Sequence, residues 1–363
     1  MYWIPIVAAA YLLLKKNNKE SNVKNKNMAN CNKLFLDYDN NLNISKKKKD
    51  KLKNSKEVLR DRIRKYFKDN HPDYKPEFYI QGSYKMGTTI LTKDDECDLD
   101  DGVYFKREAD VTATTLQKWV KDALEGATSK PIEHRAKCLR VIYQGDYHID
   151  FPVYIFPKED EHPSLAVKNN GFEESDPKEV VEWYKIEKAK DTQLNRLVKY
   201  LKGWGDYKRN KMPSGLAMTI LAANNIQAND RDDIALKNTL IKIQETLNSG
   251  FECIVPATPG DDLFENFDDT RKNNFLSNLD DFIEDAKKAV NNEPNQLKAS
   301  RLWRKHLGNN FPLGEDVDVD AKEAALKAVS KKVLSGTAYS QSSGVITSEN
   351  TGVKNKPHTN YGG

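Results

Sequence analysis

An acidic pair that runs straight into an apolar segment constrains this chain more than any other feature of its sequence. The segment Asp98–Phe105 reads DLDDGVYF, and its apolar end predicts a buried strand. Side chains two apart in a strand lie on one face, so Asp98 and Asp100 should point together while Asp101 points away. Two carboxylates held a few ångströms apart repel unless a cation lies between them, and hard oxygen ligands suit Mg²⁺ or Mn²⁺. A bulge in the strand would let Asp101 exchange roles with Asp100.

Two further features favour a metal site here, although a single D-x-D motif in so charged a chain is usually a solvated turn. Gly82-Ser83 lies upstream and predicts a turn with exposed backbone amides, which suits close approach to phosphate. Asp150 stands inside the apolar run Tyr147–Phe156, where an unpartnered carboxylate is costly to bury. Together these residues predict a three-carboxylate metal site beside a phosphate-binding turn. This combination is typical of an enzyme that transfers nucleotidyl groups.

The same residues carry a resemblance. Gly82-Ser83, Asp98-x-Asp100 and Asp150 resemble the active-site signature of the polymerase-beta-like nucleotidyltransferase superfamily. A narrower similarity, to the bacterial cGAS/DncV-like nucleotidyltransferases, is carried by the segments QGSYKMGT, DLDDGVYF and YHIDFPVYIF. These enzymes make cyclic oligonucleotide second messengers in CBASS anti-phage defence. The likeness extends over roughly Met28 to Leu334.

The resemblance implies an α+β fold, with a nucleotidyltransferase palm of mixed sheet and flanking helices followed by a C-terminal helical lobe. It implies substrates ATP and/or GTP, two Mg²⁺ (or Mn²⁺) ions, and a downstream effector reached through the cyclic nucleotide. It also implies the functional residues. The metal-binding and catalytic ones are Asp98, Asp100 and Asp150, and the nucleotide-binding ones are Gln81, Gly82, Ser83, Lys199 and Ser214.

Periodicity along the chain predicts the domain organisation. Residues 1–27 form an apolar and basic extension, and 28–190 the catalytic domain with an N-terminal brace helix over Lys46–Asn70. The pattern beyond Pro157 becomes helical, and 191–334 are expected to form the helical nucleotide-binding lobe. Residues 335–363 are polar without apolar periodicity, which predicts a disordered tail.

The two ends suggest further properties. The apolar run before Lys15 is short for a membrane span, and it indicates either a weak membrane anchor or an upstream start codon ahead of Met28. The four cysteines lack any C-x-x-C pair and fit a cytoplasmic protein with reduced thiols. The chain ends in Gly-Gly, and by the resemblance an E1/E2-like enzyme could conjugate the protein through Gly363.

Two other functions remain open from the sequence. A template-independent nucleotidyltransferase that extends RNA or modifies a protein or small molecule would use the same three acids. A catalytically silent scaffold would have no need to keep Gly82, Ser83 and the aspartates together. No residues match the zinc-bound insertion of animal relatives, so zinc-dependent DNA sensing is not expected.

Overall fold

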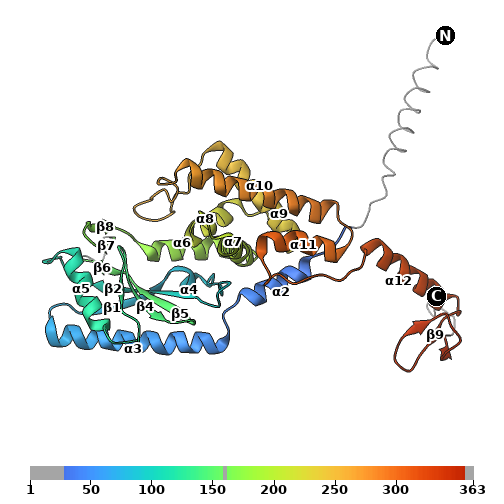
Figure 1. The fold of residues 1–363 in the computed structure, drawn as a ribbon, viewed down its shortest axis with the longest axis horizontal. Helices are drawn as coiled ribbons and strands as arrows, with labels where there is room; N and C mark the ends of the chain where they lie inside the picture. The colour runs from blue at the N-terminus through green and yellow to red at the C-terminus, as the bar shows by residue number, and fades with distance from the viewer. Residues whose placement is uncertain (1–27, 158–161, 356–363) are drawn as a thin grey trace, which may run out of the picture. The chain divides into compact units, whose positions relative to one another are not determined.

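The computed structural model describes residues 28–157 and 162–355 (Figure 1). They divide into two compact units: one contains Cys31–Lys287 and Leu302–Pro312, and the other contains the described parts of Met1–Asn30, Lys288–Arg301 and Leu313–Gly363. The predictions for residues 1–27 and for conjugation through Gly363 lie outside the described residues. In the described part of the chain, no helix is long and apolar enough to cross a membrane.

Helices and strands alternate in the first part of the described chain, and a run of helices from α6 to α12 follows. The helices are α2 (Asn32–Leu42), α3 (Lys46–Asn70), α4 (Gly82–Met86), α5 (Ala113–Leu124), α6 (Pro177–Lys190), α7 (Leu194–Lys208), α8 (Gly215–Asn225), α9 (Asp232–Ser249), α10 (Asp269–Asn291), α11 (Gln296–Leu307) and α12 (Val319–Leu334). The strands are β1 (Pro76–Gln81), β2 (Asp98–Phe105), β3 (Glu133–His134), β4 (Leu139–Tyr143), β5 (Tyr147–Phe151), β6 (Val153–Ile155), β7 (Ser164–Val167), β8 (Gly171–Glu174), β9 (Tyr339–Ser340), β10 (Ile346–Thr347) and β11 (Val353–Lys354).

A mixed sheet forms the centre of the larger unit, with strand order β3-β4-β5-β2-β6-β7-β8 and β1 paired to β2. Strand β2 runs parallel to β5 and β6 and antiparallel to β1. The predicted strand Tyr147–Phe156 is divided at Pro152, which lacks an N–H and so cannot continue the ladder. Because β2 pairs with both halves, it lies in the middle of the sheet.

One face of the sheet is covered by α3 and α5 (Figure 1). The predicted brace helix is found with the predicted bounds: Ser45 caps it by accepting a hydrogen bond from Lys48 N, and it ends at Asn70, before His71 and a proline. Its buried stripe, including Leu59, Ile63 and Phe67, joins the hydrophobic core formed by the sheet and α5. This packing covers one face of β2, while α4 also contacts β2 and α6 contacts the neighbouring β1.

The helical part of the larger unit begins at α6. Asp176 caps α6 by accepting hydrogen bonds from Lys178 N and Glu179 N, and Pro177 follows at the first turn. Helix α7 buries much of its surface, and it packs against α8. The expected α+β fold, with a mixed-sheet palm and a following helical region, is confirmed.

The smaller unit differs from the prediction for the tail. Residues from Ser335 onward were expected to lack structure, but β9 pairs antiparallel with β10 and with β11. Gly344 and Gly352 adopt positive φ angles in this region, and Gln341 N donates to Val345 O across the first turn. The strands have two residues each, which is too short to leave a periodic pattern in the sequence.

Candidate active site

Strand β2 separates its three acids between two faces. Asp98 and Asp100 lie on the face away from α3, whereas Asp101 is fully buried on the opposite face. There Arg60 of α3 holds Asp101 with two hydrogen bonds, from Nε to Oδ2 at 2.7 Å and from Nη2 to Oδ1 at 2.6 Å. The β1–β2 pairing runs unbroken through Asp100 and Asp101, so the strand is not bulged at this point.

Asp150 of β5 is the direct neighbour of Asp100 in the parallel pair β2–β5. Both carboxylates, together with Asp98, line one cavity of about 430 Å³. Three acids that are distant in the sequence therefore meet at one place on the sheet because β2 and β5 are adjacent.

Both oxygens of the Asp150 carboxylate accept a hydrogen bond from a neighbour. Arg140, its cross-strand partner on β4, donates from Nε to Oδ1 and from Nη2 to Oδ2, both at 2.7 Å. Among residues 28–157 and 162–355, Asp98, Asp100 and Asp150 do not form a group whose ligand atoms all lie within 4.8 Å of one another. The sequence predicted the meeting of the three acids but not the arginine.

The Gly82-Ser83 bend faces the acids closely. Gly82 has φ +61°, and a Cβ built on it would lie 2.1 Å from Asp100 Oδ2. Only glycine can bring the backbone this near to the carboxylate without a clash. Ser83 follows at the start of α4, and its hydroxyl lies 3.0 Å from Thr89 Oγ1.

Two ionisable groups in the cleft have strongly perturbed pKa values. Burial raises the pKa of Asp100 to about 7, and the neighbouring charges of Asp150 and Asp98 add to this shift. Burial also lowers the pKa of Lys202 to about 8, against the attraction of Asp100 and Asp98. A buried acid of raised pKa beside a second acid is the electrostatic setting in which a bound cation is stabilising.

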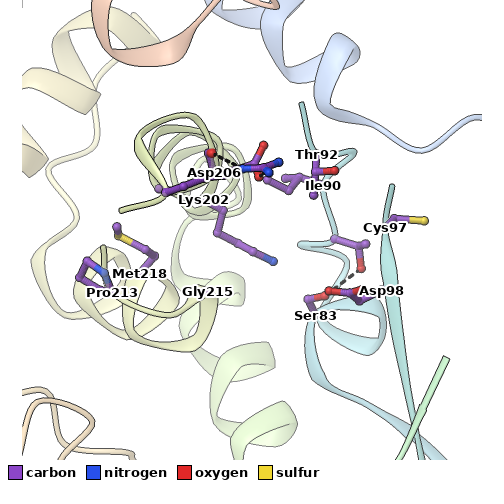
Figure 2. Close-up of a pocket in the computed structure, with 13 residues that line it drawn as sticks. Ser83, Ile90, Thr92, Cys97, Asp98, Lys202, Asp206, Pro213, Gly215 and Met218 are labelled. Atoms are coloured by element: carbon purple, nitrogen blue, oxygen red, sulfur yellow. Dashed lines mark hydrogen bonds and ion pairs between the residues drawn. The ribbon is translucent and has the colours of Figure 1, made fainter. Parts of the chain in front are cut away.

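The lysine that reaches this cleft is Lys202, not the predicted Lys199. Lys202 extends from α7 toward Ser83 and Asp98 (Figure 2) and donates a hydrogen bond to Thr88 O at 2.8 Å. Lys199 is 4% exposed and pairs with Asp39 of α2 at 2.5 Å. The two lysines lie three residues apart on one helix, and tertiary packing decides which of them faces the acids.

The remaining predicted nucleotide-binding residues have clear local roles. Gln81 is buried, donates to Tyr154 Oη at 3.0 Å and accepts from Tyr104 Oη at 3.1 Å. Ser214 caps α8 by accepting a hydrogen bond from Ala217 N at 3.2 Å, and its exposed position precedes Gly215, which lines the cleft. A nucleotide contact of either side chain stays a prediction.

Asp98 has a partner that the sequence did not indicate. His148 is its register neighbour on β5, and His148 Nδ1 lies 3.1 Å from Asp98 Oδ1. On its other side, His148 Nε2 lies 3.7 Å from Glu96 Oε2. The imidazole therefore holds the more exposed of the two β2 carboxylates on the cavity side.

The cleft continues into a second chamber of about 320 Å³ (Figure 2). The two chambers share Ser83, Asp98, Lys202 and Gly215. The end of the second chamber is formed by Asp206 and Arg209, and Arg209 also pairs with Asp94 at 2.5 Å. Ser83, Asp98 and Lys202 thus lie at the junction between the two chambers, whereas Gly82, Asp100 and Asp150 line the first chamber.

A separate group also has ligand-like geometry. His162, Asp176 and Glu179 offer three ligand atoms within 4.8 Å of one another. These side chains have protein partners: His162 Nε2 lies 3.2 Å from Thr258 Oγ1, and Thr258 N donates to Glu179 Oε2 at 2.7 Å. The group contains an imidazole and two acids outside the cleft that holds Asp98.

Comparison with known proteins identifies the domain that carries this site. Residues 76–154 match the family model described as the nucleotidyltransferase domain of cyclic GMP-AMP synthase DncV-like proteins. These residues form a DncV-like nucleotidyltransferase domain. The match extends from the start of β1 into β6 and so contains Gly82, Ser83 and all three acids. The prediction of a nucleotidyltransferase of the cGAS/DncV-like group is confirmed.

Similar proteins agree with this DncV-like domain. A c-di-GMP synthase of Roseivirga ehrenbergii is 25% identical over 299 residues, covering 70% of this chain and 77% of the relative. The Vibrio cholerae DncV cyclic AMP-GMP synthase, solved with a linear intermediate, superposes with a TM-score of 0.68 at 19% identity, covering 79% of this chain and 99% of that one. Escherichia coli DncV, solved with 3′-deoxy GTP, gives a TM-score of 0.66 at 21% identity, covering 74% and 93%. The fold of these enzymes therefore extends through most of the chain, well beyond the matched domain.

Proposed function

We propose that this chain is a metal-dependent nucleotidyltransferase that makes a cyclic dinucleotide second messenger from ATP and/or GTP. The observation that carries the proposal is the junction between the two chambers. Asp98 lies there with Ser83 and Lys202, and Asp100 lies in the first chamber against Gly82. Acids, a close backbone bend and a buried cation in one cleft are what transfer between nucleoside triphosphates requires.

The residues of the cleft fit a divalent cation. Gly82 leaves room at Asp100 that a Cβ would fill, and the raised pKa of Asp100 reflects a buried acid without enough compensating charge. Asp98, Asp100 and, once released by Arg140, Asp150 would hold the ions, which we propose to be two Mg²⁺ or Mn²⁺. Bound there, the ions would neutralise the triphosphate and favour in-line displacement.

The protein's own groups would position the reactants. Ser83 and Lys202 would hold the triphosphate, and Asp150 would accept the proton of the attacking ribose hydroxyl, directly or through water. The hydroxyl oxygen forms a bond to the α-phosphorus, the bond from this phosphorus to the bridging oxygen breaks, and pyrophosphate leaves with the electron pair. A second transfer of the same kind closes the ring.

Two chambers that meet at Asp98 suit two nucleotides. The second chamber offers Lys202 and the start of α8 to a triphosphate, whereas Arg209 in that chamber is already paired with Asp94 and Asp206. The chamber with Asp150 and Arg140 lies beside the acid proposed to receive the hydroxyl proton. The names of the similar enzymes, a c-di-GMP synthase and a cyclic AMP-GMP synthase, support a cyclic dinucleotide as the product class.

The test is to incubate the purified protein with ATP and GTP, singly and together, with Mg²⁺ or Mn²⁺. We expect pyrophosphate release and a phosphatase-resistant cyclic product in mass spectrometry, both lost in Asp98→Ala. A ladder of linear products or a modified macromolecule would instead favour the template-independent alternative. Product formation that persists in Asp98→Ala would contradict the proposal.

The wider role follows from the resemblance. We propose that the product signals to an effector in anti-phage defence in the cytoplasm, and that an E1/E2-like enzyme conjugates the protein through Gly363. Cells that carry the complete system should lose protection from phage with Asp98→Ala. They should lose it with deletion of Gly363 only if conjugation is needed. Protection that is unchanged in Asp98→Ala would refute the signalling role.

A further inference from the structure

Arg140 donates one hydrogen bond to each oxygen of the Asp150 carboxylate. Its two parallel hydrogen bonds, both 2.7 Å, join residues directly opposite each other on β4 and β5. The side chains are only 16% and 10% exposed. A planar guanidinium that binds a carboxylate with both partners mostly buried is among the strongest side-chain contacts.

This contact places a positive charge beside the predicted metal centre. Asp150 adjoins Asp100 in the parallel pair, and Arg140 lines the same chamber as both acids. The guanidinium thus provides part of the charge compensation that a cation would provide. A divalent ion that takes Asp150 as a ligand must share the carboxylate with the arginine or displace one of its hydrogen bonds, and it must overcome repulsion from the guanidinium.

We propose that Arg140 is a latch on the third acid: it holds Asp150 away from metal until a nucleotide phosphate gives the guanidinium another anion. The inference rests on the proposed function. Arg140 lines the same chamber as Asp100 and Asp150, so a phosphate bound there lies within its reach. Metal and nucleotide would then bind cooperatively, because each relieves a cost imposed on the other.

The experiment measures Mn²⁺ binding by electron paramagnetic resonance without nucleotide, so activity is not the readout. Arg140→Gln should bind Mn²⁺ at least about tenfold more tightly than wild type, since a competing charge is removed. Arg140→Lys keeps the positive charge but cannot donate the two parallel hydrogen bonds, so it should raise the Mn²⁺ affinity by a smaller factor. Arg135→Gln, an exposed arginine that pairs with Glu133, is the matched control and should bind as wild type does. With a saturating non-hydrolysable ATP analogue, wild type and Arg140→Gln should converge.

The outcomes separate the latch from the proposed function. Thermal melting first shows which variants fold, and Arg140→Lys tests the latch if Arg140→Gln does not. Unchanged or weaker Mn²⁺ binding in the folded Arg140 variants would overturn the latch, provided that Asp98→Ala weakens binding. If Asp98→Ala also leaves Mn²⁺ binding unchanged, the metal centre of the proposed function fails as well.

Discussion

Replacing Gly82 with alanine tests the close approach between the bend and Asp100. The new Cβ would lie 2.1 Å from Asp100 Oδ2 and 3.0 Å from its Cγ, so the carboxylate or the bend must move. Alanine at φ +61° adds about 1 kcal/mol of backbone strain. Relieving the overlap adds about 1–3 kcal/mol. We therefore expect Gly82→Ala to lower the free energy of unfolding by about 2–4 kcal/mol and to reduce product formation about a hundredfold or more.

Gly126 provides a matched control for this prediction. It has φ +70°, but nothing lies within 4 Å of a Cβ built there. Gly126→Ala should therefore lose only about 1 kcal/mol from backbone strain and keep its activity. Urea denaturation and pyrophosphate release measure the two effects. The account of the bend is refuted if Gly82→Ala matches Gly126→Ala in both stability and activity.

Three further predictions follow from the site. Asp101→Ala should cost about 3–5 kcal/mol in urea denaturation, because Arg60 loses the buried carboxylate that accepts two of its hydrogen bonds and keeps only its longer contact with Glu57. Asp98→Ala should abolish product with little loss of stability, and equal stability losses in the two variants would contradict this. Lys202→Ala should raise the KM for nucleotide about tenfold or more, while Lys199→Ala should mainly lower the melting temperature; the reverse result would restore the sequence prediction for Lys199. In EDTA, the stability that Asp100 contributes is fully present below its ordinary pKa of 3.8 and is lost as the pH rises toward its folded pKa of about 7. The thermal stability of Asp100→Asn should therefore exceed that of wild type by an amount that grows from pH 4 to 7 and is constant above it. A difference that does not change with pH would contradict the raised pKa.

Local patterns were sufficient to predict the elements on which the site is built. The stripe of Lys46–Asn70 gave the brace helix, and the alternation in Asp98–Phe105 separated Asp101 from Asp98 and Asp100. Periodicity of this kind depends only on neighbours in the chain. It did not predict α2, α11 or the strands β3, β7 and β8, which are short or have mixed polarity.

The residues that were missed depend on contacts between elements. Lys199 and Lys202 have the same chemistry on one helix, and only the packing of α7 distinguishes them. Arg140 was within reach of sequence reasoning, because a hairpin turning at Gly145 sets Arg140 opposite Asp150 once Tyr143 is paired with Tyr147. The pairing of His148 with Asp98 follows from the parallel register of β2 and β5, which no local signal fixes.

The most direct test of the account is the position of the metal. Crystals grown with Mn²⁺ and a non-hydrolysable nucleotide should show anomalous density in contact with Asp98 and Asp100, with Asp150 turned from Arg140 toward the ion. Density at His162, Asp176 and Glu179 alone, with the cleft at Asp98 empty, would contradict the account.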